Sequence, residues 1–288
     1  MTYLLLLFLL KLCIVSTFDP STVNYCEDKC PGAAGVEHTA CKCVHEPPRK
    51  IDEENLADFR KLIVDVHNEL RNKVASGGEA ETNEFIKGAS NMRVMNYDLE
   101  LEYIAKCLAF KFKENHDRCR DKHKGNMAGQ NLAGSSRNRE DIRSLLMSWY
   151  DEFKEVNSDD AIDNYGGGLP IGHFTQMVWA EADLVGCSRV WNPKTPTQAF
   201  YYTLICNYAS TTGPGGNLIG TPVYMKGDAC SACPGDLKCE TEKYSALCGK
   251  LLAVPTAAIG APAAGIASQA SISPFVLIIA PFIYIVFY

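Results

Sequence analysis

The cysteines are the feature that most constrains how this chain can fold. Thirteen occur in 288 residues, and Cys13 lies in a short apolar N-terminal segment. The remaining twelve form an even set, which is typical of disulfide-braced extracellular domains because thiols pair in oxidising compartments. Zinc-thiolate binding is the alternative, but the CxxC at Cys230 and Cys233 is not repeated by Cys239 and Cys248. We therefore predict six disulfides.

The N-terminal segment has the character of a secretory signal peptide. Residues Tyr3 to Leu10 are almost entirely Leu and Phe, and small residues follow at 15–17. This apolar run is shorter than the roughly 20 residues that a membrane-spanning helix needs. We predict cleavage near Thr17 and secretion of the mature chain.

Charge excludes one class of partner. The formal net charge is −6, and no basic run of five or more residues occurs. Phosphate backbones are bound by clustered Lys and Arg, so nucleic acid is not an expected partner.

Composition divides the chain into six regions. The third is long enough for one substantial core, whereas the fourth is short and depends on its bridges. The regions are a signal peptide at 1–17, a cysteine-rich segment at 18–50, a globular domain at 51–225, a cysteine-rich module at 226–249, an Ala/Gly/Pro linker at 250–271 and a hydrophobic tail at 272–288.

Periodicity in the globular domain predicts helices first and strands later. Apolar residues recur every three or four positions from Leu56 to Val74, and Gly77 and Gly78 end this helix. Two further helices are predicted at 98–114 and 139–157. Runs of β-branched and aromatic residues predict strands at 174–180, 185–191 and 200–208. This order indicates an α+β fold with helices layered on an antiparallel sheet.

Several motifs resemble those of the CAP superfamily, which includes cysteine-rich secretory proteins, insect antigen five and plant pathogenesis-related proteins. The longest is Gly-His-Phe-Thr-Gln-Met-Val-Trp at 172–179. Shorter matches lie at 67–71, 116–119, 129–132, 149–153 and 206–208, and an insertion at 210–215 departs from the pattern. Residues 25–26 and 38–41 resemble arthropod antigen-five, or venom-allergen, proteins. The resemblance covers residues 25 to about 225 and implies a three-layer α-β-α sandwich, here with a short disulfide-rich C-terminal extension.

The same resemblance implies part of the disulfide pattern. The implied pairs are Cys26–Cys41, Cys30–Cys119 and Cys187–Cys206. The remaining pair would be Cys43–Cys107, although both cysteines are displaced from their usual places. The pairing of Cys230, Cys233, Cys239 and Cys248 stays open.

In relatives, two histidines and two acidic residues line a cleft. The matching positions here are His116, Gln130, Glu152 and His173. Glu152 also lies at the margin of the apolar face predicted for 139–157, where a carboxylate needs a donor such as a histidine on a neighbouring strand.

Two neutral imidazoles, His116 and His173, can hold Zn²⁺. We expect such binding to be weak and reversible, because Gln130 stands where many relatives have Glu. A hydrogen-bond network that only orients the cleft is the alternative. The remaining histidines are interpreted as packing (His67) or surface residues (His38, His45 and His123).

The resemblance implies a non-enzymatic binding protein for a lipid, a sterol or an extracellular receptor. No Ser or Cys nucleophile motif and no HExxH helix is present. The alternatives are a metal-assisted hydrolase with Glu152 as general base, and a venom or salivary effector that acts on host receptors.

The hydrophobic tail suggests attachment to the outer cell surface. Residues 272–288 carry no charge and follow small residues at 263–268, which is the pattern of a GPI-attachment signal. A retained transmembrane tail and a free apolar C-terminus are the alternatives.

Overall fold

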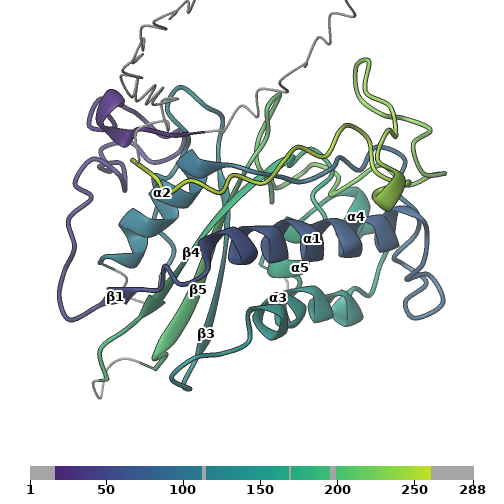
Figure 1. Cartoon of the computed structure of the whole chain (residues 1–288). Coiled ribbons are helices and arrows are strands. Elements are labelled where there is room, and N and C mark those ends of the chain that lie inside the picture. Colours follow the sequence, from purple (N-terminus) through teal and green to yellow (C-terminus); the bar gives the residue numbers. More distant parts are fainter. Residues whose placement is uncertain (1–16, 112–114, 169, 195–198, 261–288) are drawn as a thin grey trace, which may run out of the picture.

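The computed structural model describes residues 17–111, 115–168, 170–194 and 199–260 (Figure 1). The hydrophobic tail and all but the last residue of the predicted signal peptide lie outside these ranges. Within them, no helix combines the length and the apolar character needed to cross a bilayer.

A five-stranded sheet forms the centre of the domain, and β5 (Tyr202–Ala209) is buried along its whole length. The strand order is β1-β4-β5-β3, with antiparallel pairing throughout. A short β2 pairs with β4 in parallel. The other strands are β1 (Lys50–Ile51), β2 (Asn96–Tyr97), β3 (Gly129–Ser135) and β4 (Leu184–Trp191).

Helices cover both faces of the sheet. Leu204 and Tyr208 of β5 belong to the main core, which they share with α1 (Leu56–Ala75), α3 (Ile142–Tyr150) and α5 (Gly172–Met177). Ile205 faces the other way and packs on α2 (Leu99–Ala109). At Gly186 of β4 a Cβ atom would lie 2.3 Å from the Glu102 nitrogen, so α2 rests directly on the strand. Figure 1 shows α1, α3 and α5 grouped together, with α2 apart from them. The predicted α-β-α sandwich is confirmed.

Helix α1 follows the predicted periodicity and ends where expected, with Gly77 in the left-handed region at φ +78°. Its motif at 67–71 is structural. His67 hydrogen-bonds through Nδ1 to the Ile63 carbonyl at 2.7 Å. The buried Arg71 guanidinium donates to the Arg93 carbonyl and to four carbonyls at the end of α5 and in the turn after it, those of Met177, Trp179, Ala180 and Ala182. Burial lowers the pKa of Arg71 to about 9, so it remains a cation at neutral pH.

Two sequence-based expectations about secondary structure are wrong. The segment predicted as a strand at 174–180 forms α5 and the turn after it, because a carboxylate binds the first amide groups of the helix, as described below. The helix predicted at 139–157 is α3 followed by a 3-10 helix, η2 (Asp151–Glu155). The remaining short helices are α4 (Asp160–Asp163), η1 (Pro20–Thr22) and η3 (Glu242–Tyr244).

Six disulfides are present in the described residues. Four are the pairs that the family resemblance implied, including Cys43–Cys107. In the C-terminal module the pairs are Cys230–Cys239 and Cys233–Cys248.

Residues 250–260, which we call the C-terminal strap, are bound to the domain. Composition predicted a linker there. The buried Arg60 of α1 donates to the carbonyls of Pro255 (3.0 Å) and Ala257 (2.7 Å) while it pairs with Glu102 at 2.7 Å. The Gly260 amide reaches the Phe18 carbonyl at 3.0 Å, and Figure 1 shows the strap running past α1 toward α2. Backbone carbonyls make these contacts, so side-chain composition did not reveal them.

Candidate functional site

The four residues selected from the sequence line one cavity of about 340 Å³. They come from four places in the fold: His116 from the loop after α2, Gln130 from β3, Glu152 from η2 and His173 from α5. The rest of the lining consists of Asn131, Tyr165, Pro170, Gly172 and Asn217. The structure therefore brings the four positions together in a polar cleft.

Glu152 holds His173 in place. One carboxylate oxygen accepts the backbone N–H groups of His173 (2.8 Å) and Phe174 (3.1 Å), which are free at the start of α5. The other oxygen contacts His173 Nδ1 at 2.6 Å. The Trp149 ring stacks on the imidazole with an interplanar angle of 13°. The donor expected for Glu152 is thus present, but it lies on a helix and not on a strand.

Gln130 holds His116 in place. Its side-chain carbonyl lies 2.7 Å from His116 Nδ1, and its NH₂ group donates to Asn207 (2.9 Å) and to Asp117 (2.8 Å). Both amide protons are therefore used, and the carbonyl must face the ring. His116 consequently carries its proton on Nδ1.

The electrostatic environment keeps His116 neutral. The residue is exposed at the surface of the cleft, yet desolvation by the surrounding protein lowers its pKa below the usual 6.5, and the nearby Arg120 and His173 act in the same direction. At neutral pH its Nε2 therefore has a free lone pair. His173 Nε2 is also free of the Glu152 contact, so both imidazoles can act as ligands or hydrogen-bond acceptors.

Three polar residues that complete the cleft were missed in the sequence. Asn131 donates to the His173 carbonyl at 3.0 Å, and Asp117 and Asn207 fix the Gln130 amide. Asp117 and Asn131 directly follow His116 and Gln130 within the recognised motifs, and that adjacency was the available signal. Asn207 also lies in a recognised motif, but only the β3–β5 register, which places it opposite Gln130, gives its role.

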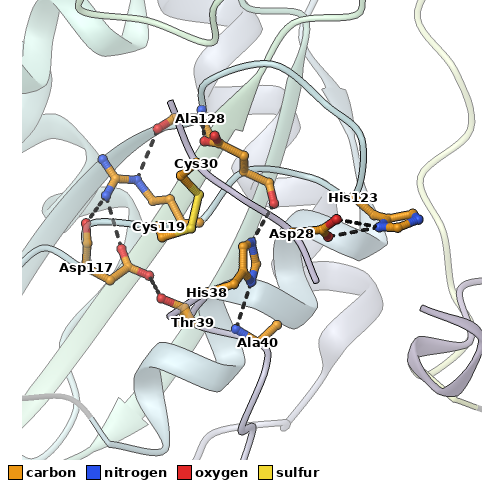
Figure 2. The surroundings of a disulfide bond; sticks show 11 residues. Asp28, Cys30, His38, Thr39, Ala40, Asp117, Cys119, His123 and Ala128 are labelled. Carbon is orange, nitrogen blue, oxygen red and sulfur yellow. Dashed lines mark hydrogen bonds and ion pairs between the residues drawn. A yellow bond between two sulfur atoms is a disulfide. The ribbon is translucent and has the colours of Figure 1, made fainter. Parts of the chain in front are cut away.

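A second cluster has the residue types of a metal site but is not one in the oxidised protein. Cys30, His38 and Cys119 offer ligand atoms within 4.8 Å of one another, yet the two sulfurs form a disulfide (Figure 2). Both nitrogens of the His38 ring are occupied, one by the Ala40 amide (3.1 Å) and one by the Asp121 carbonyl (2.8 Å). His38 is only 1% exposed, so its interpretation as a surface residue is wrong.

Comparisons with known proteins agree with the motifs and the fold. The model of the cysteine-rich secretory protein family (CAP) matches residues 64–208. Venom allergen 5 of Polistes dominula is 36% identical over 70% of this chain and 90% of its own length. Venom allergen 3 of Solenopsis invicta is 34% identical over 70% and 88%.

A solved structure gives the same picture in three dimensions. The crystal structure of NaASP2 with Zn²⁺ superposes with a TM-score of 0.52 and 27% identity, covering 72% of this chain and all of that one. Family match, relatives and fold together show that this chain belongs to the cysteine-rich secretory protein (CAP) family and has venom allergen 5 proteins among its relatives.

Proposed function

We propose that this is an extracellular, non-enzymatic binding protein whose cleft holds a divalent cation reversibly through Nε2 of His116 and of His173. One observation carries the proposal: both rings have Nδ1 bonded to a fixed oxygen, of Gln130 and of Glu152, which leaves Nε2 as the free ligand atom. In metal-binding histidines, the ring nitrogen that does not bind the metal commonly donates to an oxygen acceptor in this way.

The donor set supports weak zinc binding. Imidazole nitrogen is a normal zinc ligand, and the remaining positions would be filled by water. Among the described residues, two groups of three possible metal ligands have their ligand atoms within 4.8 Å of one another: Cys30, His38 and Cys119, and Cys230, Cys233 and Cys239. The cysteines of both groups are already joined in disulfides. His116 and His173 belong to neither group, so we expect the cation to have only these two protein ligands. NaASP2, whose structure contains Zn²⁺, adds support from the same fold.

The geometry gives little support to hydrolysis. Glu152 is the candidate general base, but one of its oxygens accepts two backbone amides and the other faces His173. These contacts occupy three of the roughly four lone-pair sites of the carboxylate, and a general base needs one free within reach of the attacking water. We therefore propose that the cleft binds without turnover.

Binding of a lipid, a sterol or an extracellular receptor remains a second proposal, as does anchoring through the tail. The histidine, amide and carboxylate lining of the cleft suits a hydrated ligand better than an aliphatic one. A lipid or receptor would accordingly use another surface of the protein.

Native mass spectrometry and calorimetry with zinc chloride at neutral pH would test the metal proposal on the secreted, oxidised protein. We expect one zinc per chain, lost in His116→Ala and in His173→Ala. His123→Ala is the matched control, because this imidazole pairs with Asp28 away from the cleft lining. Undiminished zinc binding in the His116→Ala/His173→Ala double variant would refute the proposal.

A further inference from the structure

A chain of hydrogen bonds links the cysteine-rich N-terminal segment to the cleft. The Thr39 hydroxyl donates to one oxygen of the Asp117 carboxylate (Figure 2). The other oxygen accepts the Gln130 amide at 2.8 Å, and the Gln130 carbonyl faces His116 Nδ1 at 2.7 Å. Thr39 is thus three hydrogen bonds from the imidazole that we assign to the metal.

The N-terminal segment is firmly fixed around Thr39, where this series of hydrogen bonds begins. The disulfide Cys30–Cys119 joins it to the loop that carries His116. The Thr39 amide donates to the Cys119 carbonyl at 2.8 Å, and the His38 ring bonds to the Asp121 carbonyl at 2.8 Å. Figure 2 shows His38 and Thr39 close to the Cys30–Cys119 bridge. Thr39 is 5% exposed, so water has little access to its hydroxyl.

The available donors and acceptors fix which group donates in each hydrogen bond of this series. An ionised carboxylate only accepts hydrogen bonds, so Asp117 requires donors from both Thr39 and Gln130. Arg120 adds a third donor, at 3.2 Å, and balances the charge of Asp117. The Gln130 amide therefore points its NH₂ group at Asp117 and its carbonyl at His116. With the amide reversed, its NH₂ would face Nδ1 of His116 and the ring proton would move to Nε2, which blocks a metal.

We infer that Thr39 and Asp117 are positioning residues for the cleft, which together set the tautomer of His116 and keep its Nε2 free to bind a metal. The inference rests on the proposed function for its consequence, but the tautomer itself is independent of any metal. It also assigns a role in the cleft to the N-terminal segment, although no residue of that segment lines the 340 Å³ cavity.

Two variants that remove a contact, with two controls, separate positioning from simple structural support. Thr39→Val keeps the shape and removes the hydroxyl, and Thr39→Ser restores it. Asp117→Asn keeps the shape and removes the charge. Thr203→Val is the matched control, because Thr203 is also buried and its hydroxyl accepts one hydrogen bond, from Asn192, on the α2 side of the sheet.

The first readout is the tautomer of each ring in the full secreted protein, from long-range ¹H–¹⁵N correlation spectra of ¹⁵N-histidine-labelled samples. We expect Nδ1–H on His116 in the native chain, in Thr39→Ser and in Thr203→Val. Asp117→Asn should shift His116 toward Nε2–H. Thr39→Val leaves the carboxylate ionised but removes the donor that fixes its rotation, so we expect a smaller shift in the same direction. His173, which Glu152 holds, should stay unchanged in every variant and serves as an internal reference.

The second readout is zinc affinity by calorimetry at neutral pH. Loss of an outer partner of a metal ligand typically costs 10- to 100-fold, so we expect about a 10-fold weaker affinity in Asp117→Asn and a smaller loss in Thr39→Val. An unchanged His116 tautomer in both variants would overturn the inference even if the native chain binds zinc. If the native chain binds no zinc but the tautomer shifts as expected, the positioning role stands and the proposed function fails.

Discussion

The two histidines of the cleft are held by different kinds of structure. His173 lies on α5, and Glu152, the residue that orients it, lies 21 residues away in the same helical layer. His116 lies on a loop, and its orientation depends on Gln130 of β3 and on Thr39, which is 78 residues from Asp117. The core fixes the His173 imidazole directly, whereas the disulfide-linked N-terminal segment helps to fix the His116 imidazole. The two halves of the cleft should therefore fail separately when the protein is perturbed.

Removal of the Cys30–Cys119 bridge should have the largest effect. With Cys26–Cys41 and Cys43–Cys107 intact, the bridge closes a path of about 18 residues, which corresponds to roughly 3 kcal/mol in the chain-entropy model. We expect Cys30→Ser/Cys119→Ser to lose that much unfolding free energy in urea titrations. Hydrogen exchange should accelerate in residues 36–41 and 115–121 but not in α5. Equal acceleration in α5 would mean that the two halves are one cooperative unit.

Acid should act through His67, which lies beneath the His173 half. Its ring contacts the Tyr208 hydroxyl at 2.9 Å, and that hydroxyl lies 3.5 Å from Asn131. Burial lowers the pKa of His67 to about 4 from 6.5. Between these values the unfolded chain binds the extra proton, so stability is lost as pH falls from 6.5 toward 4, by about 3 kcal/mol.

The measurement is the unfolding free energy of the native chain and of His67→Gln across this pH window. We expect the variant to be less stable at neutral pH and to lack this part of the pH dependence. Parallel curves for the two proteins would show that His67 is not the group responsible.

Glu152→Ala should produce the opposite pattern to loss of the disulfide. It leaves two amide groups at the start of α5 and the His173 ring without their acceptor. Hydrogen bonds to a charged group are worth about 1.5–3 kcal/mol when they are lost, and partial exposure of Glu152 places the expected total near 2 kcal/mol. Exchange should accelerate in residues 172–178, while the His116 ring keeps its Nδ1–H tautomer. A change of tautomer at His116 would contradict the separation of the halves.

Gln130→Glu should have the smallest effect on stability, and it distinguishes charge from geometry. The new carboxylate would face Asp117, which in the native chain accepts a hydrogen bond from the Gln130 amide. We expect a loss of about 1 kcal/mol from the unpaired acceptors, together with tighter zinc binding because negative charge lies beside His116. Adding Asp117→Asn should restore the lost stability. If zinc binding weakens instead, the orientation of the Gln130 amide matters more for zinc binding than added negative charge at this position.

The sequence predicted the parts of this molecule that local pattern controls. The 3.6-residue period of α1 and the β-branched runs of β4 and β5 were sufficient to place those elements. Strand β3 was missed because Gly129–Ser135 has weak β-propensity and forms only through its seven-residue ladder with β5. The segment at 174–180 was misread because the same apolar residues suit a buried helix once Glu152 supplies its first acceptor.

The site followed the same division between local and distant information. Motifs that resemble a known family located His116, Gln130, Glu152 and His173, which the structure then brought into one cavity. The contact between Thr39 and Asp117 joins residues 78 apart, and nothing in either segment alone indicates it. Burial of His38 was hidden for the same reason, because its partner is the carbonyl of Asp121, 83 residues away.

The long-range Cys30–Cys119 bridge has a consequence for how the protein is made. Translation adds about 5–20 residues per second, so Cys30 is synthesised on the order of 10 s before its partner, 89 residues later. During that interval Cys26 and Cys41, only 15 residues apart, are already available to pair, and Cys43 is a competing thiol. Correct folding therefore requires that Cys30 stays reduced until Cys119 is made, or that an early wrong disulfide is rearranged. The yield from a producing cell should accordingly depend on its supply of disulfide isomerase.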